Sequence, residues 1–235
     1  MTLAEAQLHG LMEALEGDAM SFALLDWYAR QAAPPRIVRP DDVPPDLADL
    51  WRLAETVTGC PPAVFDITTD LGIPAFCAVP SRFSRLGALG AGASLNPGCA
   101  AERAVIELME AHEHIADFNV EEVTYRMLAN LRQLPGIRRC VTLDADDLAG
   151  RAVPIAPQPA AWWNAQAGDP ADQVKVVLGR LDRAGLHAYQ ARWSGPESGI
   201  CVLTVLVPGL ETFFLSRMGV PVLPSGRGAR TFGLR

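Results

Sequence analysis

The sequence has no apolar run long enough to cross a bilayer. The longest run, residues 200–207, is interrupted by Thr204, whereas a membrane-spanning helix needs about 20 apolar residues. The N-terminus, MTLAE, has no basic region and no apolar stretch after it, so it lacks the features of a signal peptide. We therefore expect a cytoplasmic protein that does not associate with membranes.

Lysine is almost absent, and basic charge is in the minority. Lys175 is the only lysine among 20 basic residues, which face 27 acidic ones, and the formal net charge is −7. A chain of this charge is poorly suited to nonspecific binding of nucleic acid or of anionic membranes. We therefore expect no nucleic acid among its partners.

Paired cysteines are missing as well. The five cysteines are Cys60, Cys77, Cys99, Cys140 and Cys201, and none forms a CxxC pair. This disfavours a zinc site built on thiolates, and without a secretory context a disulfide framework has no support. Cys77 and Cys201 lie in strand-like apolar runs, where a thiol acts as a small buried hydrophobe, so we expect both to be buried and free.

Several catalytic motifs are also absent. The chain has no GxSxG, HExxH or Walker A motif, and no Ser-His-Asp or Cys-His set can be placed, so the catalytic residues stay unknown. The segment GAGASL at residues 90–95 begins like GxGxxG, but Leu95 stands at the last glycine position. It therefore fails as a dinucleotide-binding fingerprint.

What the chain does have is the composition of a globular protein. Of its 235 residues 49% are hydrophobic and 20% are charged, enough for a core without covalent staples. Periodicity predicts helices over residues 2–31, 46–58, 97–118, 120–134 and 171–184, and strands over 63–67, 73–79, 186–193 and 200–207. Residues 34–45, rich in proline and aspartate, resemble an internal linker.

A helix followed by two strands occurs at residues 46–79 and again at 171–207. We interpret this echo as an α/β fold with one mixed β-sheet and covering helices, in which all four predicted strands share the sheet. Chance recurrence of a helix-then-hairpin unit explains the echo equally well, so the pairing of the strands stays an expectation.

Two groups of acidic residues have the spacing of metal ligands. Glu13 and Glu16 are three apart on the first helix and share a face, and paired carboxylates suit Mg²⁺, which prefers oxygen ligands. Glu107, Glu110 and His114 share a face of the third predicted helix and form a second candidate metal site. Both patterns are equally typical of a solvated polar face.

The C-terminus carries only basic charge after Glu211. Its four arginines are Arg217, Arg227, Arg230 and Arg235, and Arg227 and Arg230 lie in the glycine-containing stretch PSGRGAR at residues 224–230. Such arginines can bind a phosphate or a carboxylate. An alternative is a terminal segment whose charges only keep it soluble.

Four segments together resemble the YcaO family. They are the helix from TLAEA to EALEGDA within residues 2–19, the stretch DITTDLGIP at 66–74, GAGAS at 90–94 with the helix 100–110, and GL at 185–186 with VLVPGLE at 205–211. The segments come in the family's order. The resemblance implies a single YcaO-like α/β domain over residues 1–235.

The resemblance also implies a function. Family members use ATP and Mg²⁺ to activate a peptide amide, giving azolines, thioamides or amidines in ribosomally made peptides. In that scheme Glu13, Glu16 and Glu107 hold Mg²⁺, while Glu107, Glu110, Arg227 and Arg230 lie at the nucleotide. The expected partner is a peptide substrate or a second protein, and the expected assembly is a homodimer or a heteromer.

The chain departs from the family pattern at several points. The family's usual N-terminal portion is missing, Gly17 replaces an arginine, and Glu110 replaces a glutamine. These departures make a complementing chain, which supplies the missing portion, part of the expectation. Two alternatives stay open: a non-catalytic YcaO-like scaffold that binds a peptide or a modifying enzyme, and a small metal-binding α/β protein using Glu107, Glu110 and His114.

Overall fold

The computed structural model describes residues 2–31, 33–81, 88–117, 138–140, 143, 145–165, 168–194, 199–218, 220 and 222–231. The helices are α1 (Leu3–Leu24), η1 (Leu25–Arg30), η2 (Pro40–Asp42), α2 (Pro45–Thr58), α3 (Pro97–Asp117), α6 (Ala145–Arg151), α7 (Ala160–Trp163), α8 (Pro170–Arg183), η4 (Phe213–Met218) and α9 (Gly226–Thr231). The strands are β1 (Arg36–Val38), β2 (Pro62–Asp66), β3 (Ala75–Pro80), β4 (Gly90–Ala93), β5 (Val153–Pro154), β6 (Tyr189–Ser194) and β7 (Val202–Leu206).

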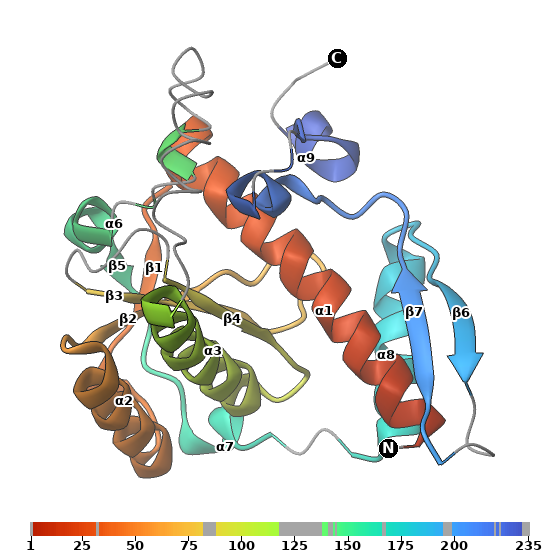
Figure 1. Cartoon of the computed structure of the whole chain (residues 1–235), viewed down its shortest axis with the longest axis horizontal. Coiled ribbons are helices and arrows are strands. Elements are labelled where there is room, and N and C mark those ends of the chain that lie inside the picture. The colour runs from red at the N-terminus through yellow and green to blue at the C-terminus, as the bar shows by residue number, and fades with distance from the viewer. Residues whose placement is uncertain are drawn as a thin grey trace.

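Five strands form a mixed sheet in the order β4-β3-β2-β1-β5 (Figure 1). The pairs from β1 to β4 are antiparallel, and β5 runs parallel to β1. Alternate residues of β3 enter different cores: Cys77 packs with α1 and α8, whereas Phe76 packs with α2 and α3. The helices therefore cover both faces of the sheet, and the predicted α/β class with a mixed sheet is confirmed.

The first helix begins with a capping box. The backbone N–H of Glu5 donates to the Thr2 hydroxyl (3.2 Å), and the N–H of Thr2 donates to the Glu5 carboxylate (2.6 Å), so two donors at the helix start are satisfied. The helix continues from α1 into η1, a π-helix, and ends where Gln31 adopts a left-handed conformation with φ of 49°. The predicted helix over residues 2–31 is confirmed.

The remaining predicted helices have mixed outcomes. Those over 46–58, 97–118 and 171–184 are present as α2, α3 and α8. The helix predicted over 120–134 lies outside the described residues. The supposed linker 34–45 is wrong in part, because it contains β1, which pairs with both β2 and β5. Short strands bounded by prolines lack the alternation that would reveal them.

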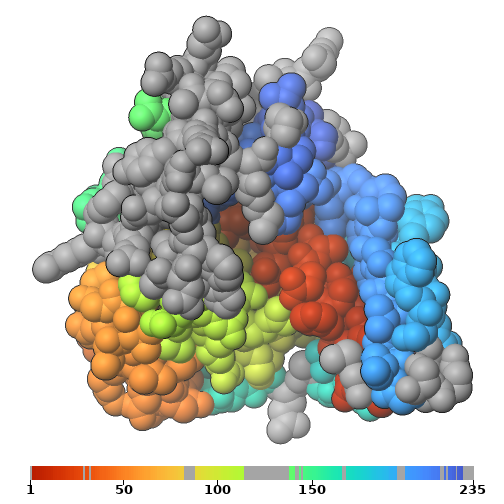
Figure 2. Space-filling model, in the orientation of Figure 1, coloured from red at the N-terminus to blue at the C-terminus, as the bar shows by residue number. Residues whose placement is uncertain are grey.

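The expectation that all four predicted strands share one sheet is also wrong. β2 and β3 belong to the five-stranded sheet, but β6 and β7 form a separate two-stranded ribbon. The ribbon lies along α1 at one side of the molecule (light blue in Figure 2), where Val205 packs against Gly10. Alternation identifies a strand and its buried face, but it does not identify the neighbouring strand.

Two further expectations concern side chains and membranes. Cys77 and Cys201 are buried free thiols, as predicted. Among the described helices, none has the length and apolar content that crossing a membrane requires.

Candidate functional site

The edge strand β4 brings two helices together from opposite faces of the sheet. Its sequence is GAGA, and its alanines face α1. A Cβ atom at Gly90 or Gly92 would overlap the backbone of α3, so only glycine allows the helix to approach this closely. In Figure 1, β4 lies between α3 and α1. Polar side chains of the two helices can therefore meet at this edge.

Three carboxylates meet there around one guanidinium. The Nη2 atom of Arg103 on α3 lies 2.6 Å from Glu13, 3.8 Å from Glu16 and 3.9 Å from Glu107. Glu13 and Glu16 come from α1, and Glu107 comes from the turn of α3 that follows Arg103. We call these four residues the acid cluster. The structure thus brings together all three glutamates that the sequence proposed as metal ligands.

Two of these carboxylates also accept hydrogen bonds from β4. The N–H of Ala91 donates to Glu107 Oε2 at 3.1 Å, and the backbone of Ala93 hydrogen-bonds to Glu16. These bonds use donors on the side of β4 that no strand covers. The edge strand therefore fixes the position of both carboxylates.

Burial and mutual repulsion favour the protonated acids. Burial, followed by the charges of Glu107 and Glu13, raises the pKa of Glu16 to about 8. Burial also raises the pKa of Glu107, against the lowering effect of the Ala91 hydrogen bond. Carboxylates crowded in this way gain from a cation placed between them.

The acid cluster borders a cavity of about 360 Å³, whose lining includes Glu13, Glu16 and Glu107 together with Phe214 and Arg217 of η4. Gly17 also lines it, and a Cβ there would come within 2.7 Å of the Phe214 ring. Burial lowers the pKa of Arg217 to about 10, so the side chain is still a cation at neutral pH. The cavity therefore combines negative and positive walls.

The residues present fit a hard divalent cation. All candidate ligands are carboxylate oxygens, the type that Mg²⁺ prefers, and Glu16 Oε2 is buried with no hydrogen-bond partner. With Arg103 between the acids, the part of the chain that the structure describes holds no group of three His, Cys, Asp or Glu residues arranged to bind a metal. Arg103 lies among these acids as their counter-ion.

The other predicted site residues lie elsewhere or outside the description. Glu110 is exposed on α3, one turn beyond Glu107. Arg227 is away from the acid cluster: it pairs with Asp18 at 2.5 Å and with Asp70, and it stacks over Phe22. The side chains of Arg230 and His114 lie outside the described residues.

Sequence reasoning gave Arg103 no role in this site and named Arg217 only as one of the basic residues after Glu211. Arg103 stands four residues before Glu107, and that i,i+4 spacing was a usable signal that the two share a face. Arg217 follows the last predicted strand by ten residues, and no local pattern links it to α1. Only the folded chain shows its place at the cavity.

Comparison with known proteins identifies the family. Residues 1–211 match the family model described as YcaO cyclodehydratase, ATP- and Mg²⁺-binding. A protein of Rhizobium leguminosarum bv. trifolii, described as lying in the tfuA 3′ region, is 26% identical across 98% of this chain and 56% of its own length.

Solved structures agree in fold. A heterocyclase in complex with substrate and cofactor is 26% identical with a TM-score of 0.64, over 100% of this chain and 30% of that one. YcaO from Methanopyrus kandleri bound with AMPPCP and Mg²⁺ is 18% identical with a TM-score of 0.60, over 94% of this chain and 56% of that one. The chain thus spans about half the length of the curated relative it matches. Because the family model covers most of the sequence, the chain belongs to the YcaO family, whose cofactors are ATP and Mg²⁺.

Proposed function

We propose that this chain takes part in ATP- and Mg²⁺-dependent modification of a peptide backbone. The proposed reaction is activation of an amide oxygen in a ribosomally made peptide, which leads to an azoline, a thioamide or an amidine. The observation that carries the proposal is the meeting of Glu13, Glu16 and Glu107 within 4 Å of one guanidinium nitrogen. Membership of a family that binds ATP and Mg²⁺ supports it.

In this proposal each residue of the acid cluster has a role. Glu13, Glu16 and Glu107 would hold Mg²⁺, and the ion would supply positive charge to offset the charge that develops during phosphoryl transfer. Arg103, which contacts the same carboxylates, would be the cation nearest to an anionic group beside them. Glu110 borders this nucleotide site from the next turn of α3, and Arg230 is proposed to approach it from α9.

Arg227 has a different position in the proposal. Its pairing with Asp18 and Asp70 anchors α9 to α1 and to the turn after β2. We therefore propose that it supports the nucleotide site indirectly, by holding the C-terminal segment in place.

The proposed partner is a peptide substrate, joined by a second chain that completes the active protein. The matched heterocyclase was solved with substrate and cofactor and is more than three times as long as the aligned part. We propose a heteromer as the assembly, with a homodimer as the alternative.

Binding of Mn²⁺ and ATP tests the proposal. Mn²⁺ replaces Mg²⁺ in most oxygen-ligand sites and is visible by electron paramagnetic resonance. We expect Glu16→Gln and Glu107→Gln each to weaken binding of Mn²⁺ and of Mg²⁺–ATP, while Glu102→Gln, an exposed change on the same helix, leaves both intact. Equal affinity in all three variants would reject the acid cluster as the metal site.

A non-catalytic scaffold is the second candidate, and the β6–β7 ribbon favours it. The face of the ribbon directed away from α1 exposes Tyr189, Trp193, Val202 and Leu206, each by 47% or more. A gathering of large apolar side chains on a surface often marks a protein interface. Phosphate release from ATP in the presence of partner and peptide separates the two candidates, because a scaffold that depends on another enzyme's site is insensitive to Glu16→Gln.

A further inference from the structure

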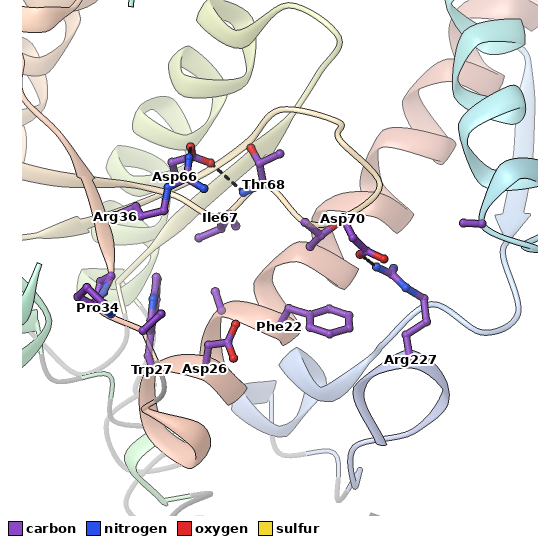
Figure 3. A pocket seen from close by; sticks show the side chains of 15 residues that line it. Phe22, Asp26, Trp27, Pro34, Arg36, Asp66, Ile67, Thr68, Asp70 and Arg227 are labelled. Carbon is purple, nitrogen blue, oxygen red and sulfur yellow. Dashed lines mark hydrogen bonds and ion pairs between the residues drawn. The ribbon is translucent and has the colours of Figure 1, made fainter. Parts of the chain in front are cut away.

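A second cavity, of about 640 Å³, lies at the C-terminal end of the long first helix (Figure 3). Its walls come from Phe22, Asp26 and Trp27 at the end of this helix, from the turn between β2 and β3, and from Arg227. It shares no lining residue with the cavity at the acid cluster. Its volume is in the range of pockets that bind small molecules and side chains.

The three carboxylates that line this cavity differ in where their cations lie. Asp66 is paired with Arg36, and Asp70 is paired with Arg227, and both arginines line the same cavity. Asp26 is paired with Arg30 at 3.5 Å, but Arg30 does not line the cavity, and both side chains of this pair are 42% exposed. Asp26 is therefore the lining carboxylate whose cation a ligand in the cavity can replace.

Apolar side chains border the Asp26 carboxylate. The carbonyls at the end of η1 already have cationic partners, because Trp27 O accepts from Arg151 at 3.1 Å and Tyr28 O accepts from Arg139 at 3.2 Å, so the attraction for a further cation comes from the Asp26 side chain itself. Trp27, which packs edge-on against Phe65, and Pro34 supply apolar surface next to the carboxylate. In Figure 3 the Asp26 carboxylate lies between Trp27 and Phe22. An apolar wall beside a carboxylate suits an aliphatic stem that ends in a positive charge.

We propose that this cavity binds an arginine or lysine side chain of a peptide, with its stem against Trp27 and Pro34 and its cation at Asp26. The inference rests on the proposed function, since it takes the peptide to be the substrate, and it names a feature by which that substrate is recognised. Recognition then takes place apart from the acid cluster, at the C-terminal end of the helix that α1 and η1 form.

A neighbouring hollow sets the direction of the bound peptide. This hollow, of about 610 Å³, shares Asp70 and Ala184 with the cavity and is lined by Arg180 and Arg183 of α8. A peptide that places its basic residue at Asp26 and continues past Asp70 meets these two arginines, which suit an acidic residue. The preferred segment is therefore basic at one position and acidic a few residues away.

Fluorine NMR of the full chain tests the assignment. The protein has five tryptophans, and incorporation of 5-fluorotryptophan gives each a resonance, with Trp27 assigned from Trp27→Phe. The probes are Nα-acetyl-arginine methylamide and its neutral counterpart with citrulline. We expect the arginine probe to shift the Trp27 signal and the citrulline probe to leave it in place.

Three variants make the test specific. Asp26→Asn should weaken arginine binding about fivefold, since a partly exposed ion pair contributes up to about 1 kcal/mol. Asp41→Asn, an exposed change of the same charge, should leave it unaltered. Arg30→Gln should strengthen binding, because the internal cation that competes for Asp26 is removed, and this gain cannot come from misfolding.

The opposite results overturn the inference. Equal binding of the arginine and citrulline probes, equal affinity in the Asp26→Asn and Asp41→Asn proteins, or no gain in Arg30→Gln would each show that Asp26 does not bind the cation. Binding of Mn²⁺ and ATP, measured on the same samples, reports separately on the acid cluster. Loss of the arginine effect with intact nucleotide binding rejects the cavity assignment alone, and the reverse result rejects the nucleotide site alone.

Discussion

Glu13 and Arg103, 90 positions apart in the chain, form a hydrogen bond of 2.6 Å between Oε1 and Nη2. This contact joins α1 to α3 past the edge of β4, although the two helices lie on opposite faces of the sheet. The same guanidinium also faces Glu16 and Glu107. Its charge offsets the repulsion among the three carboxylates.

Replacing Arg103 should destabilise the protein and increase its response to Mg²⁺. We expect Arg103→Gln to lower the free energy of unfolding by about 1–2 kcal/mol in EDTA, because three partly buried carboxylates lose their counter-ion. Mg²⁺ should stabilise the variant more than the natural protein, since the ion takes over the lost charge. Urea unfolding with and without Mg²⁺ measures both effects. Arg52→Gln, which removes an exposed pair with Asp49, is the control; an equal response of the two variants to Mg²⁺ contradicts the prediction.

The glycines of β4 should tolerate no side chain. Gly90→Ala and Gly92→Ala should each destabilise the fold by about 3 kcal/mol or more, because the added Cβ overlaps the backbone of α3. Gly179→Ala is the matched control: the residue lies within α8 and a Cβ meets nothing within 4 Å, so a gain of about 0.5–1 kcal/mol follows from helix propensity. Thermal unfolding distinguishes the loss of stability expected for the two strand variants from the gain expected for Gly179→Ala. A mild effect at both strand positions would mean that α3 does not lie this close to β4.

The buried pair of Arg227 and Asp18 should bind the C-terminal segment to α1. Both side chains are at least nine-tenths buried, so Arg227→Gln should cost about 3–5 kcal/mol by leaving an uncompensated carboxylate. Adding Asp18→Asn should recover part of the loss, because the orphan charge is then removed. A double-mutant cycle from chemical unfolding gives the coupling between the two residues. Strictly additive losses would show that the pair does not act as a unit.

The cysteines should react in a defined order. Cys99 is exposed, whereas the other four are buried, and burial raises the pKa of Cys77 and of Cys140 to about 12. At pH 8 we expect fast maleimide labelling of Cys99 and labelling of the other four only on unfolding. The pKa of Cys99 is also raised, by burial and then by the charge of Glu102, so its labelling rate should still increase above pH 9. Mass spectrometry of timed samples checks the order, and early modification of Cys77 would contradict it.

The same buried thiols should make the fold sensitive to alkali. The folded pKa of Cys77 is higher than the unfolded value of about 9, so the unfolded chain releases its proton first. The contribution of the Cys77 thiol to the free energy of unfolding is therefore fully present below pH 9 and decreases as the pH rises from 9 towards 12. Cys77→Ala should flatten this part of the stability profile relative to Cys99→Ala.

Local patterns were sufficient for the long helices. The i,i+3 spacing of Glu13 and Glu16 depends only on neighbours in sequence, and both residues lie on α1 and face Arg103. The meeting of Glu107 with that pair came from family resemblance, because spacing on one helix says nothing about which other helix approaches it.

What escaped prediction depends on contacts between distant segments. β4 reads as a glycine-rich loop in sequence, since glycine has low strand propensity, and it is a strand here because α3 packs onto it. The ribbon of β6 and β7 has the alternation of an ordinary sheet strand, and nothing local reveals that α1 is its neighbour. The cavity that Asp26 lines likewise forms only when the helix end, the turn after β2 and α9 are assembled.

The hydrogen bond from Ala91 to Glu107 makes the backbone of β4 a sensor of the site. An amide that donates to a fixed carboxylate exchanges slowly with solvent, and it exchanges faster once that carboxylate turns to another ligand. Hydrogen–deuterium exchange at Ala91, with the inward-facing amide of Gly92 as its internal standard, would therefore report occupancy of the acid cluster without any substrate, partner or enzymatic assay.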